Sequence, residues 1–318
     1  MMKFFTIPGL RISFAAFGIV VVFACNKSNP PVVNAETSTL TYALANGTST
    51  TIFYSAVVKA GLDSVFGSPA IFTLFVPNDQ ACAQSGYPQS VINAFTPDQA
   101  RSWVLYQTYA GNVLTLQSFI GKTDEKLIMA DGDSVFITGD SNRTYVNGYQ
   151  MLNTQLTASN GVMLGLQNVL VQPQQNLAQM LSTDTSLSFL NEAVLLSTPV
   201  PDSLSVLLST GGPFTFMAAD NDAFRKLGFV SPSDLSSVNP DTLRSMVLLS
   251  LIPQRLFSYD LPDSSTFLTL SDSTLLFHNT GLEASVQVLN SAFTSNVVSA
   301  NSMATNGVLF KIDELLDH

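Results

Sequence analysis

The chain has very few of the side chains that carry out most enzymatic chemistry. Among its 318 residues there are only two histidines, His278 and His318, and two cysteines, Cys25 and Cys82. Without a well-placed histidine, a Ser-His-Asp or Cys-His nucleophile has no general base. The sequence also contains no nucleophile-elbow motif, phosphate-binding loop or dinucleotide-binding fingerprint. These absences argue against most hydrolases, nucleotide-binding enzymes and dehydrogenases.

Charged residues are scarce as well, at 11% of the chain, and acids outnumber bases to give a formal net charge of -10. Serine, threonine, asparagine and glutamine must therefore cover much of the surface. An acidic surface repels phosphate backbones, so nucleic acid is not an expected partner. Hydrophobic residues make up 46% of the chain, which is enough for ordinary cores, and the length suits about two domains.

The first 24 residues predict a signal peptide. An almost wholly apolar run of 13 residues, Ile12–Ala24, is too short to span a bilayer and is typical of a signal-peptide core. Residues 22–25, Val-Phe-Ala-Cys, resemble a bacterial lipobox, which predicts a lipidated Cys25. The alternative is an ordinary secretory signal cleaved near Ala24. A lipidated Cys25 would leave Cys82 as the only thiol, and we expect Cys82 to pack as a small buried apolar group.

Residues 25–37 are polar and contain prolines, which is typical of a tether. With Cys25 at its start, this segment predicts a chain that is anchored by lipid in the bacterial cell envelope, at the outer membrane or the cell surface. No later segment is long and apolar enough to span a membrane.

The rest of the chain is an internal duplication. Four patterns of the first half return in the same order in the second half: an apolar helical pattern, an apolar strand followed by Asn or Asp, a proline-started helix that is identical at six of ten positions, and an Asn-Gly turn with a closing strand. The helical patterns start at Ile52 and Phe189, and the apolar strands with their Asn or Asp residues are Phe72–Cys82 and Phe214–Phe224. The proline-started helices are Thr96–Leu105 and Asn239–Leu248, and the Asn-Gly turns with their closing strands are Ala158–Leu170 and Ala304–Leu316. In each half helices precede most of the strands, so we expect two α+β units.

Both copies carry helix-start signals at equivalent places. Thr96 and Asn239 are expected to be N-caps, each followed by proline in the first helical position and aspartate in the first turn. The Asn and Asp residues after the first strand, around Asp79 and Asp220, are also expected to cap a helix. We therefore interpret these acids as structural rather than catalytic.

These patterns resemble the fasciclin (FAS1) domain, repeated in tandem. The first family signature, Phe/Tyr-Thr-apolar-Phe-Ala-Pro-polar-Asp-x-Ala-Phe, is similar to both strand stretches, with Cys82 in place of the aromatic and Ala219 in place of the proline. The second signature, Ala-Ser-Asn-Gly-Val-Ile-His, is similar to both closing stretches, with Leu164 and Phe310 in place of histidine. The signature positions that we expect to be structural are Phe72, Thr73, Pro77, Asp79, Asn160, Gly161, Phe214, Thr215, Asn306 and Gly307.

The resemblance implies an α+β fold of two tandem fasciclin-like domains, residues 38–173 and 174–318, each a β-sheet wedge packed with several helices. It also implies a non-catalytic cell-surface protein with an adhesion or macromolecular-interaction role. The residues themselves predict no cofactor and no metal site, and a calcium contact at the acidic positions stays open. The partner would be an extracellular or cell-surface protein or glycan. The family often carries a Tyr-His pair after the capped helix; here Tyr106-Gln107 and Leu249-Ser250 stand there, so the receptor-binding role of that pair does not carry over.

Two other functions stay open. One is an accessory glycan-capture lipoprotein of an outer-membrane polysaccharide-uptake system. The other is a catalytic lipoprotein that uses carboxylates such as Asp131 or Asp222. Asp131-Gly132-Asp133 lacks the further ligands of a calcium loop and predicts a hairpin turn, and residues 313–317 predict an acidic tail on a solvated face.

Most aromatic residues are expected in the core, because the chain has 22 Phe but only eight Tyr and one Trp. Trp103 is predicted to pack there. Four tyrosines of the first copy are candidates for a shared binding surface: Tyr106, Tyr109, Tyr145 and Tyr149.

We predict that Gly161→Val destabilises the first domain, because a turn glycine often has a positive φ that a β-branched residue cannot adopt. Thermal melting of the variant measures the loss. A melting temperature equal to that of the wild type would contradict the turn assignment.

Overall fold

The structure is a computed structural model that describes residues 38–197, 203–280 and 283–316, and these residues belong to one compact unit. The expected signal peptide, the tether with Cys25, and the terminal Asp317 and His318 lie outside the described residues. Within the described part, no helix is both long enough and apolar enough to cross a membrane.

The first domain contains most of its helices before most of its strands. Its elements are α1 (Leu40–Ala45), α2 (Thr51–Lys59), α3 (Asp63–Phe66), β1 (Phe72–Pro77), α4 (Asp79–Gln84), α5 (Gln89–Ala94), α6 (Pro97–Tyr106), β2 (Thr108–Ala110), the short 3-10 helix η2 (Leu116–Phe119), β3 (Lys122–Ile128), β4 (Ser134–Gly139), β5 (Thr144–Val146), β6 (Tyr149–Ala158) and β7 (Gly161–Leu166).

The second domain repeats this order. Its elements are α7 (Leu177–Thr183), η3 (Thr185–Leu187), α8 (Ser188–Leu196), α9 (Leu204–Thr210), β8 (Phe214–Ala219), α10 (Asn221–Lys226), η4 (Pro232–Ser237), α11 (Pro240–Leu249), β9 (Leu251–Ile252), η5 (Ser258–Asp260), β10 (Thr266–Leu268), β11 (Thr274–Asn279), β12 (Ala284–Val288), β13 (Ser295–Ala304) and β14 (Gly307–Ile312).

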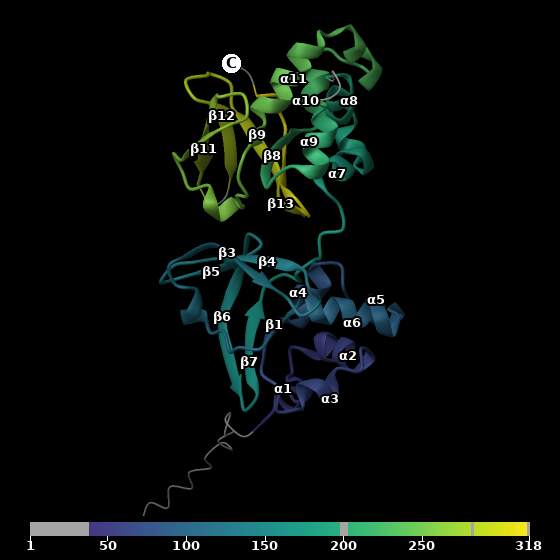
Figure 1. Ribbon diagram of the computed structural model, residues 1–318, viewed down its shortest axis with the longest axis vertical. Helices are drawn as coiled ribbons and strands as arrows, with labels where there is room; N and C mark the ends of the chain where they lie inside the picture. Colours follow the sequence, from purple (N-terminus) through teal and green to yellow (C-terminus); the bar gives the residue numbers. More distant parts are fainter. Residues whose placement is uncertain (1–37, 198–202, 281–282, 317–318) are drawn as a thin grey trace, which may run out of the picture. The chain divides into compact units, whose positions relative to one another are not determined.

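Each domain has a seven-stranded sheet with the same topology. The order is β2-β1-β7-β6-β5-β4-β3 in the first domain, and β9-β8-β14-β13-β12-β11-β10 in the second. In both, one parallel pair lies among antiparallel pairs: β1 with β7, and β8 with β14. The helices of each domain gather beside its sheet (Figure 1). The predicted duplication and the α+β class are therefore confirmed.

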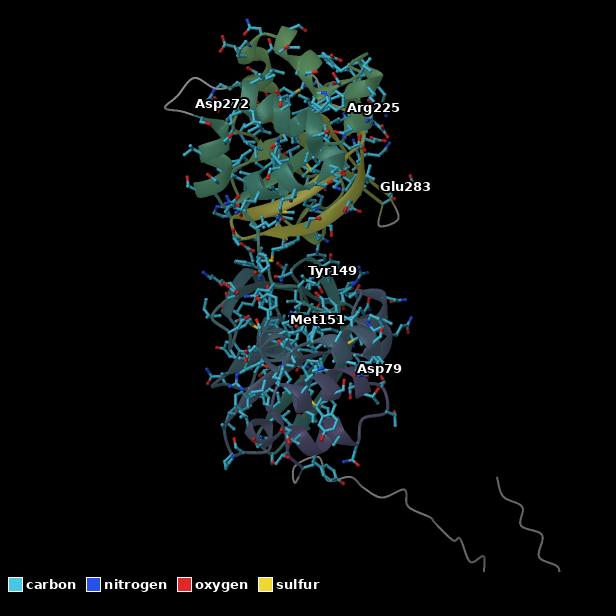
Figure 2. The ribbon with its side chains drawn as sticks, turned by 90° about the vertical axis from the view of Figure 1, so that its right-hand side faces the viewer. Asp79, Tyr149, Met151, Arg225, Asp272 and Glu283 are labelled. Atoms are coloured by element: carbon cyan, nitrogen blue, oxygen red, sulfur yellow. The ribbon has the colours of Figure 1, made fainter. Side chains whose placement is uncertain are left out.

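The central strands of the first domain are buried on both faces because neighbouring side chains point to opposite sides. Leu74, Val76 and Met163 pack with the helices, whereas Phe75 and Leu164 pack in a second cluster with residues of β4 and η2. Charged side chains such as Arg225 and Glu283 lie on the outside (Figure 2). The sheet of the first domain thus separates two apolar layers along β1 and β7.

Asn160 joins three segments of the first domain. Its Nδ2 donates hydrogen bonds to the carbonyl oxygens of Phe66 (2.8 Å) and Ser68 (2.7 Å), and its Oδ1 accepts one from the Leu40 amide (2.9 Å). The side chain therefore fixes the start of α1 and the end of α3 against the β6–β7 turn. Asn160 itself is buried; its bonds to Leu40 and Phe66 form away from water, and its bond to Ser68 is partly buried.

Asn306 makes the same three bonds in the second domain. Its Oδ1 accepts from the Leu177 amide (2.9 Å), and its Nδ2 donates to the carbonyl oxygens of Leu208 (2.9 Å) and Gly211 (2.7 Å). We call this three-bond arrangement the asparagine clamp. It holds α7, the end of α9 and the β13–β14 turn together.

The glycines after the clamps are required by close packing of two strands. A Cβ on Gly161 would lie 1.9 Å from the Phe72 carbonyl oxygen, and one on Gly307 would lie 2.3 Å from that of Phe214. Gly161 also has a φ of 152°. The contact with the neighbouring strand, rather than φ alone, excludes a larger residue at both positions.

The threonines of the first signature tie down the loops that follow β2 and β9. The Thr73 hydroxyl donates to the Asn112 carbonyl oxygen (3.0 Å) and accepts from the Leu114 amide (2.8 Å). The Thr215 hydroxyl does the same with Gln254 and Leu256, at 2.8 Å each.

In each domain, the two residues that follow the first strand cap two different helices. The first of them caps the helix that comes directly after it, and the second caps an earlier helix. The Asn78 side chain accepts from the third residue of α4, and the Asp79 carboxylate accepts from the Ile52 amide of α2 at 2.8 Å. In the second copy Asp220 caps α10, and Asn221 accepts from the Phe189 amide of α8 at 3.2 Å. Pro77 ends β1 as a buried residue.

Several side chains lie where the sequence predicted them. Cys82 is fully buried, Trp103 packs against Phe53, and Asp131 lies in the turn between β3 and β4. Thr96 and Asn239 are the N-caps of α6 and α11.

Two predictions were wrong. Tyr106 is 1% exposed, so the four tyrosines of the first copy do not share a surface. Asp313 is not part of a solvated tail: it is half-buried, and its carboxylate accepts hydrogen bonds from the backbone amide (2.7 Å) and the side chain (2.9 Å) of Asn296. Its role is therefore to join the end of β14 to β13.

We predict that Asn160→Ala lowers the free energy of unfolding of the first domain by about 3 kcal/mol, because a buried side chain loses three hydrogen bonds. Urea unfolding followed by tryptophan fluorescence measures this domain alone, since the chain has a single tryptophan, Trp103. The control is Asn153→Ala on exposed β6, which should change the value by less than about 0.5 kcal/mol. Equal losses in the two variants would contradict the clamp.

Candidate binding site

The two domains touch through a stacked pair of tyrosines. Tyr145 of β5 and Tyr259 of η5 have ring centroids 3.8 Å apart with an interplanar angle of 24°. The Tyr259 hydroxyl donates to Asp140 Oδ2 at 2.6 Å, which lowers the pKa of Asp140 and raises that of Tyr259 to about 12. This hydrogen bond fixes the stacked ring.

A cation and two carboxyl groups lie beside this stack. The guanidinium of Arg255 lies 3.7 Å from the centroid of the Phe136 ring, and one of its nitrogens lies 4.0 Å from Asp124 Oδ2. Thr138 Oγ1 donates to Asp260 Oδ1 at 3.3 Å. Burial raises the pKa of Asp124 to about 6, although Arg255 opposes the shift, and burial also raises the pKa of Asp260. We call these contacts the domain joint.

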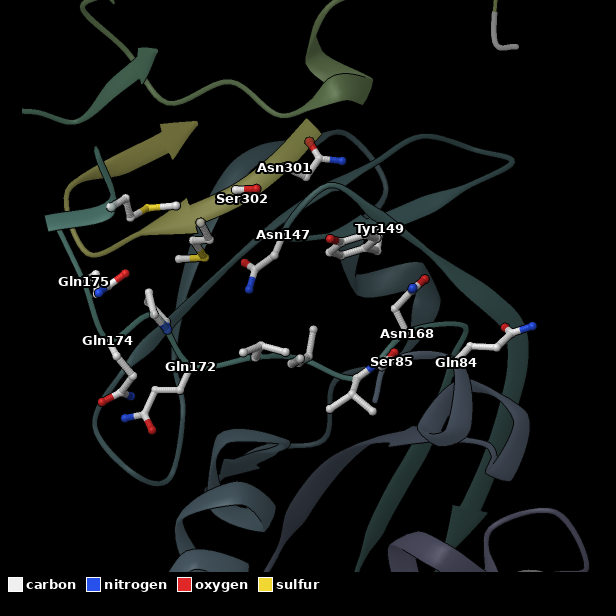
Figure 3. Close-up of a pocket in the computed structure, with 16 residues that line it drawn as sticks. Gln84, Ser85, Asn147, Tyr149, Asn168, Gln172, Gln174, Gln175, Asn301 and Ser302 are labelled. Atoms are coloured by element: carbon white, nitrogen blue, oxygen red, sulfur yellow. Dashed lines mark hydrogen bonds between the residues drawn. The ribbon is translucent and has the colours of Figure 1, made fainter. Parts of the chain in front are cut away.

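Next to the joint is a cleft of about 600 Å³ with residues of both domains in its walls (Figure 3). Seven of its sixteen lining residues carry side-chain amides, and none is charged at neutral pH. The amides belong to Gln84, Asn147, Asn168, Gln172, Gln174, Gln175 and Asn301. Most of one wall comes from the segment that connects the two domains.

Two of these amides hold the walls in place. Asn147, with a φ of 48°, accepts from the Phe136 amide (2.9 Å) through Oδ1. Asn301, with a φ of 61°, accepts from the Ser258 amide (2.8 Å) and donates to the Gly148 carbonyl oxygen (3.4 Å). Both backbone conformations are sparsely populated, and asparagine tolerates them better than most residues do.

Other amides stay available to a ligand. In the part of the chain that the structure describes, the side chains of Gln84, Asn168 and Gln174 make no hydrogen bond to the protein. Tyr149 adds a partly exposed ring, and burial raises the pKa of its hydroxyl, which therefore stays neutral at physiological pH. Amides and a neutral phenol offer both donors and acceptors without charge.

This arrangement suits binding of an uncharged polar ligand rather than catalysis. The cleft contains no carboxylate, imidazole, thiol or amine that could transfer a proton near neutral pH. Over residues 38–197, 203–280 and 283–316, no group of three or more His, Cys, Asp or Glu is arranged to hold a metal ion. Asp131 and Asp222 lie elsewhere, and Asp222 is exposed in an ion pair with Arg225.

None of the ten signature residues lines the cleft; all lie in the framework of their own domain. Of the side chains singled out in the sequence, only Tyr149 reaches it. The available signal was composition: residues 167–176 contain four glutamines and two asparagines. Such a run predicts a polar connector, and only the folded chain shows that the connector lines a cleft.

Two α+β units in tandem, each with the same seven-stranded sheet, define a duplicated-domain protein without a catalytic centre in its cleft. The family model for the fasciclin domain matches residues 48–172 and 192–318. The chain therefore belongs to the fasciclin domain family, as the resemblance in its sequence implied.

Similar proteins include the transforming growth factor-beta-induced protein ig-h3 of Sus scrofa, 22% identical over 293 residues, and that of Oryctolagus cuniculus, 24% identical over 274 residues. These matches cover 91% and 85% of this chain but 41% and 38% of those proteins, so the chain spans about two fifths of their length. A solved FAS1 domain pair from the insect cell adhesion molecule fasciclin I matches with 15% identity and a TM-score of 0.41, over 84% of this chain and 96% of that chain.

We predict that the buried Asp124 carboxyl of the domain joint makes the free energy of unfolding fall as the pH rises from 4.5 to 6.5. A carboxyl group whose pKa is raised by folding binds its proton more tightly in the folded state, so stability falls as pH rises through the window between the unfolded and folded pKa values. For Asp124 this window runs from 3.8 to about 6.

Urea unfolding at both pH values should show a smaller fall in stability for Asp124→Asn than for the wild type. The control is Asp272→Asn at an exposed turn (Figure 2), which should keep the wild-type pH dependence. An unchanged pH dependence in Asp124→Asn would show that the buried carboxyl at the joint does not carry the effect.

Proposed function

We propose that this protein is a non-catalytic cell-surface lipoprotein that acts in adhesion or macromolecular interaction. The observation that carries the proposal is the cleft, which offers seven amides and no charged side chain. Membership of the fasciclin domain family supports it, and the solved insect relative is described as a cell adhesion molecule. The expected partner is an extracellular or cell-surface protein or glycan, and no cofactor is required.

Anchoring is the second part of the proposal. The lipobox-like residues 22–25 place Cys25 at the start of the mature chain, where acyl chains would hold it to the bacterial cell envelope. The polar segment 25–37 would then separate the domains from the membrane. This places the cleft outside the membrane, where a macromolecule can reach it.

A second candidate is glycan capture for an outer-membrane polysaccharide-uptake system. The amides of the cleft favour it, because sugar hydroxyls are donors and acceptors at once, and side-chain amides can satisfy both roles. The partly exposed Tyr149 ring adds an apolar face to the same cleft. In this version the partner of the cleft is a glycan rather than a protein.

We expect Cys25→Ser to move the protein from the membrane fraction to the soluble fraction, because serine lacks the thiol that carries the acyl chains. Cell fractionation with a labelled fatty acid measures both the location and the modification. Cys82→Ala, which removes the buried thiol instead, should stay labelled and membrane-bound. Unchanged membrane association of Cys25→Ser would refute the anchor.

We expect Ser302→Trp, which fills the cleft, to reduce adhesion of beads coated with residues 26–318 to the producing cells at least about fivefold. Thr157→Trp, an equal change at an exposed position of β6, should adhere as the wild type does. Equal adhesion of all three coatings would remove the cleft from the proposal, and wild-type beads that adhere no better than uncoated beads would refute the adhesion role itself.

A further inference from the structure

A second hollow, of about 460 Å³, is lined by residues of the first domain and by Gln174, the first residue of the second. Four aromatic residues form part of its wall: Tyr87 after α4, Phe95 at the end of α5, and Trp103 and Tyr106 on α6. The Trp103 ring lies 5.7 Å from that of Tyr87 and 6.4 Å from that of Phe95, and the rings are inclined to one another by 45° and 64°. We call this hollow the aromatic groove.

The second domain shows that the fold does not require these aromatic residues. Tyr87 and Phe229 occupy equivalent positions, since their amides donate to the carbonyl oxygens of Cys82 and Phe224, each five residues earlier. By the same reasoning Phe95 corresponds to Val238, because both amides donate to the carbonyl oxygen three residues earlier.

Trp103 corresponds to Met246 in the matched capped helices α6 and α11. Tyr106 likewise corresponds to Leu249 at the ends of the same two helices. The second domain therefore keeps one aromatic ring of the four and lacks the indole and both phenol hydroxyls. Its helices nonetheless pack over an equivalent sheet. The aromatic cluster is an addition to a framework that is stable without it.

The rim of the aromatic groove is polar and uncharged. Gln99, Ser102, Gln172 and Gln174 line it together with the rings. Gln99 Oε1 accepts a hydrogen bond from the Thr96 amide at the start of α6, so Gln99 Nε2 stays available as a donor. Gln172 donates a hydrogen bond through Nε2 to the Asp133 carboxylate. Its Oε1 then remains as an acceptor, which at 3.5 Å takes only a long bond from the Ser102 hydroxyl.

One buried donor in the groove wall has no acceptor. Trp103 Nε1 is shielded from solvent and has no hydrogen-bond partner among the described residues. A buried N–H without an acceptor is costly, and an oxygen of a ligand that displaces the neighbouring side chains would reduce this cost. Trp103 thus packs as predicted from the sequence and also provides an unused polar group.

We propose that the aromatic groove binds a neutral saccharide. The aromatic faces are electron-rich and attract the C–H groups on the apolar face of a sugar ring. The rim supplies separate donors and acceptors for its hydroxyls, and the absence of charged lining residues leaves nothing to hold an anionic or cationic ligand.

A proline-rich peptide is the main alternative occupant of an aromatic groove. It fits less well here because proline has no N–H, so such a segment offers acceptors only and would leave the Gln172 and Gln174 oxygens unpaired. A sugar hydroxyl can donate to them. The groove and the cleft share four lining residues, 170–172 and Gln174, so they adjoin, but saccharide binding in the groove does not depend on the function proposed for the cleft.

The single tryptophan of the chain makes the test direct, because all tryptophan fluorescence comes from the groove. Residues 26–318 are titrated with cellohexaose, mannohexaose and maltohexaose, with hexagalacturonate and hexaproline as comparisons. We expect a saturable fluorescence change with at least one neutral hexasaccharide and none with hexagalacturonate or hexaproline. No change with any of the three, or a saturable change with hexaproline, would overturn the proposal.

Calorimetry of variants then locates the site. Trp103→Met, which introduces the residue found in the second domain, should melt close to the wild type and bind the hexasaccharide at least about tenfold more weakly. Gln174→Ala, at an exposed rim position, should weaken binding about threefold to tenfold.

Gln84→Ala lies in the cleft but not in the groove, and should leave the affinity within about twofold of the wild type. Wild-type affinity in Trp103→Met would overturn the groove as the binding site. A loss confined to Gln84→Ala would also overturn it, and would assign the saccharide to the cleft instead.

Discussion

Each domain depends on one asparagine side chain whose three hydrogen bonds join segments far apart in the sequence. Asn160 connects the start of α1, the end of α3 and the β6–β7 turn, and Asn306 repeats every contact in the second copy. An asparagine can do this because one amide presents two donors and an acceptor in a plane. The glycine that follows lets the neighbouring strand approach, so the parallel strand pair of each sheet forms beside the clamp.

The duplicated framework separates what folding requires from what the copies have gained individually. The clamp, the threonine that ties the next loop and the paired helix caps occur in both domains with matching partners. The aromatic groove is built from residues of the first copy that the second copy replaces, such as Trp103 by Met246, and the tyrosine stack joins unlike positions of the two copies. We therefore assign ligand recognition to features that differ between the two domains, because the shared fold forms without them.

The sequence was sufficient to predict the duplication, the α+β class and the helix caps, because all three rest on local patterns that each half shows independently. It placed Trp103 and Cys82 in the core for the same reason. It could not show that Tyr106 is buried or that Asp313 bonds to Asn296, since both depend on contacts between distant segments. The cleft was missed because its amides come from several elements and become one surface only after folding.

The common property of both candidate sites is recognition by amide, hydroxyl and aromatic groups without charge. Such contacts are barely screened by salt, whereas attraction between exposed charges weakens as ionic strength rises. The most direct measurement is the affinity of residues 26–318 for the surface of the producing cells at 50 mM and 500 mM sodium chloride. We predict affinities within about twofold of each other. A loss of more than about tenfold at high salt would contradict the account and show that charged groups outside these sites dominate recognition.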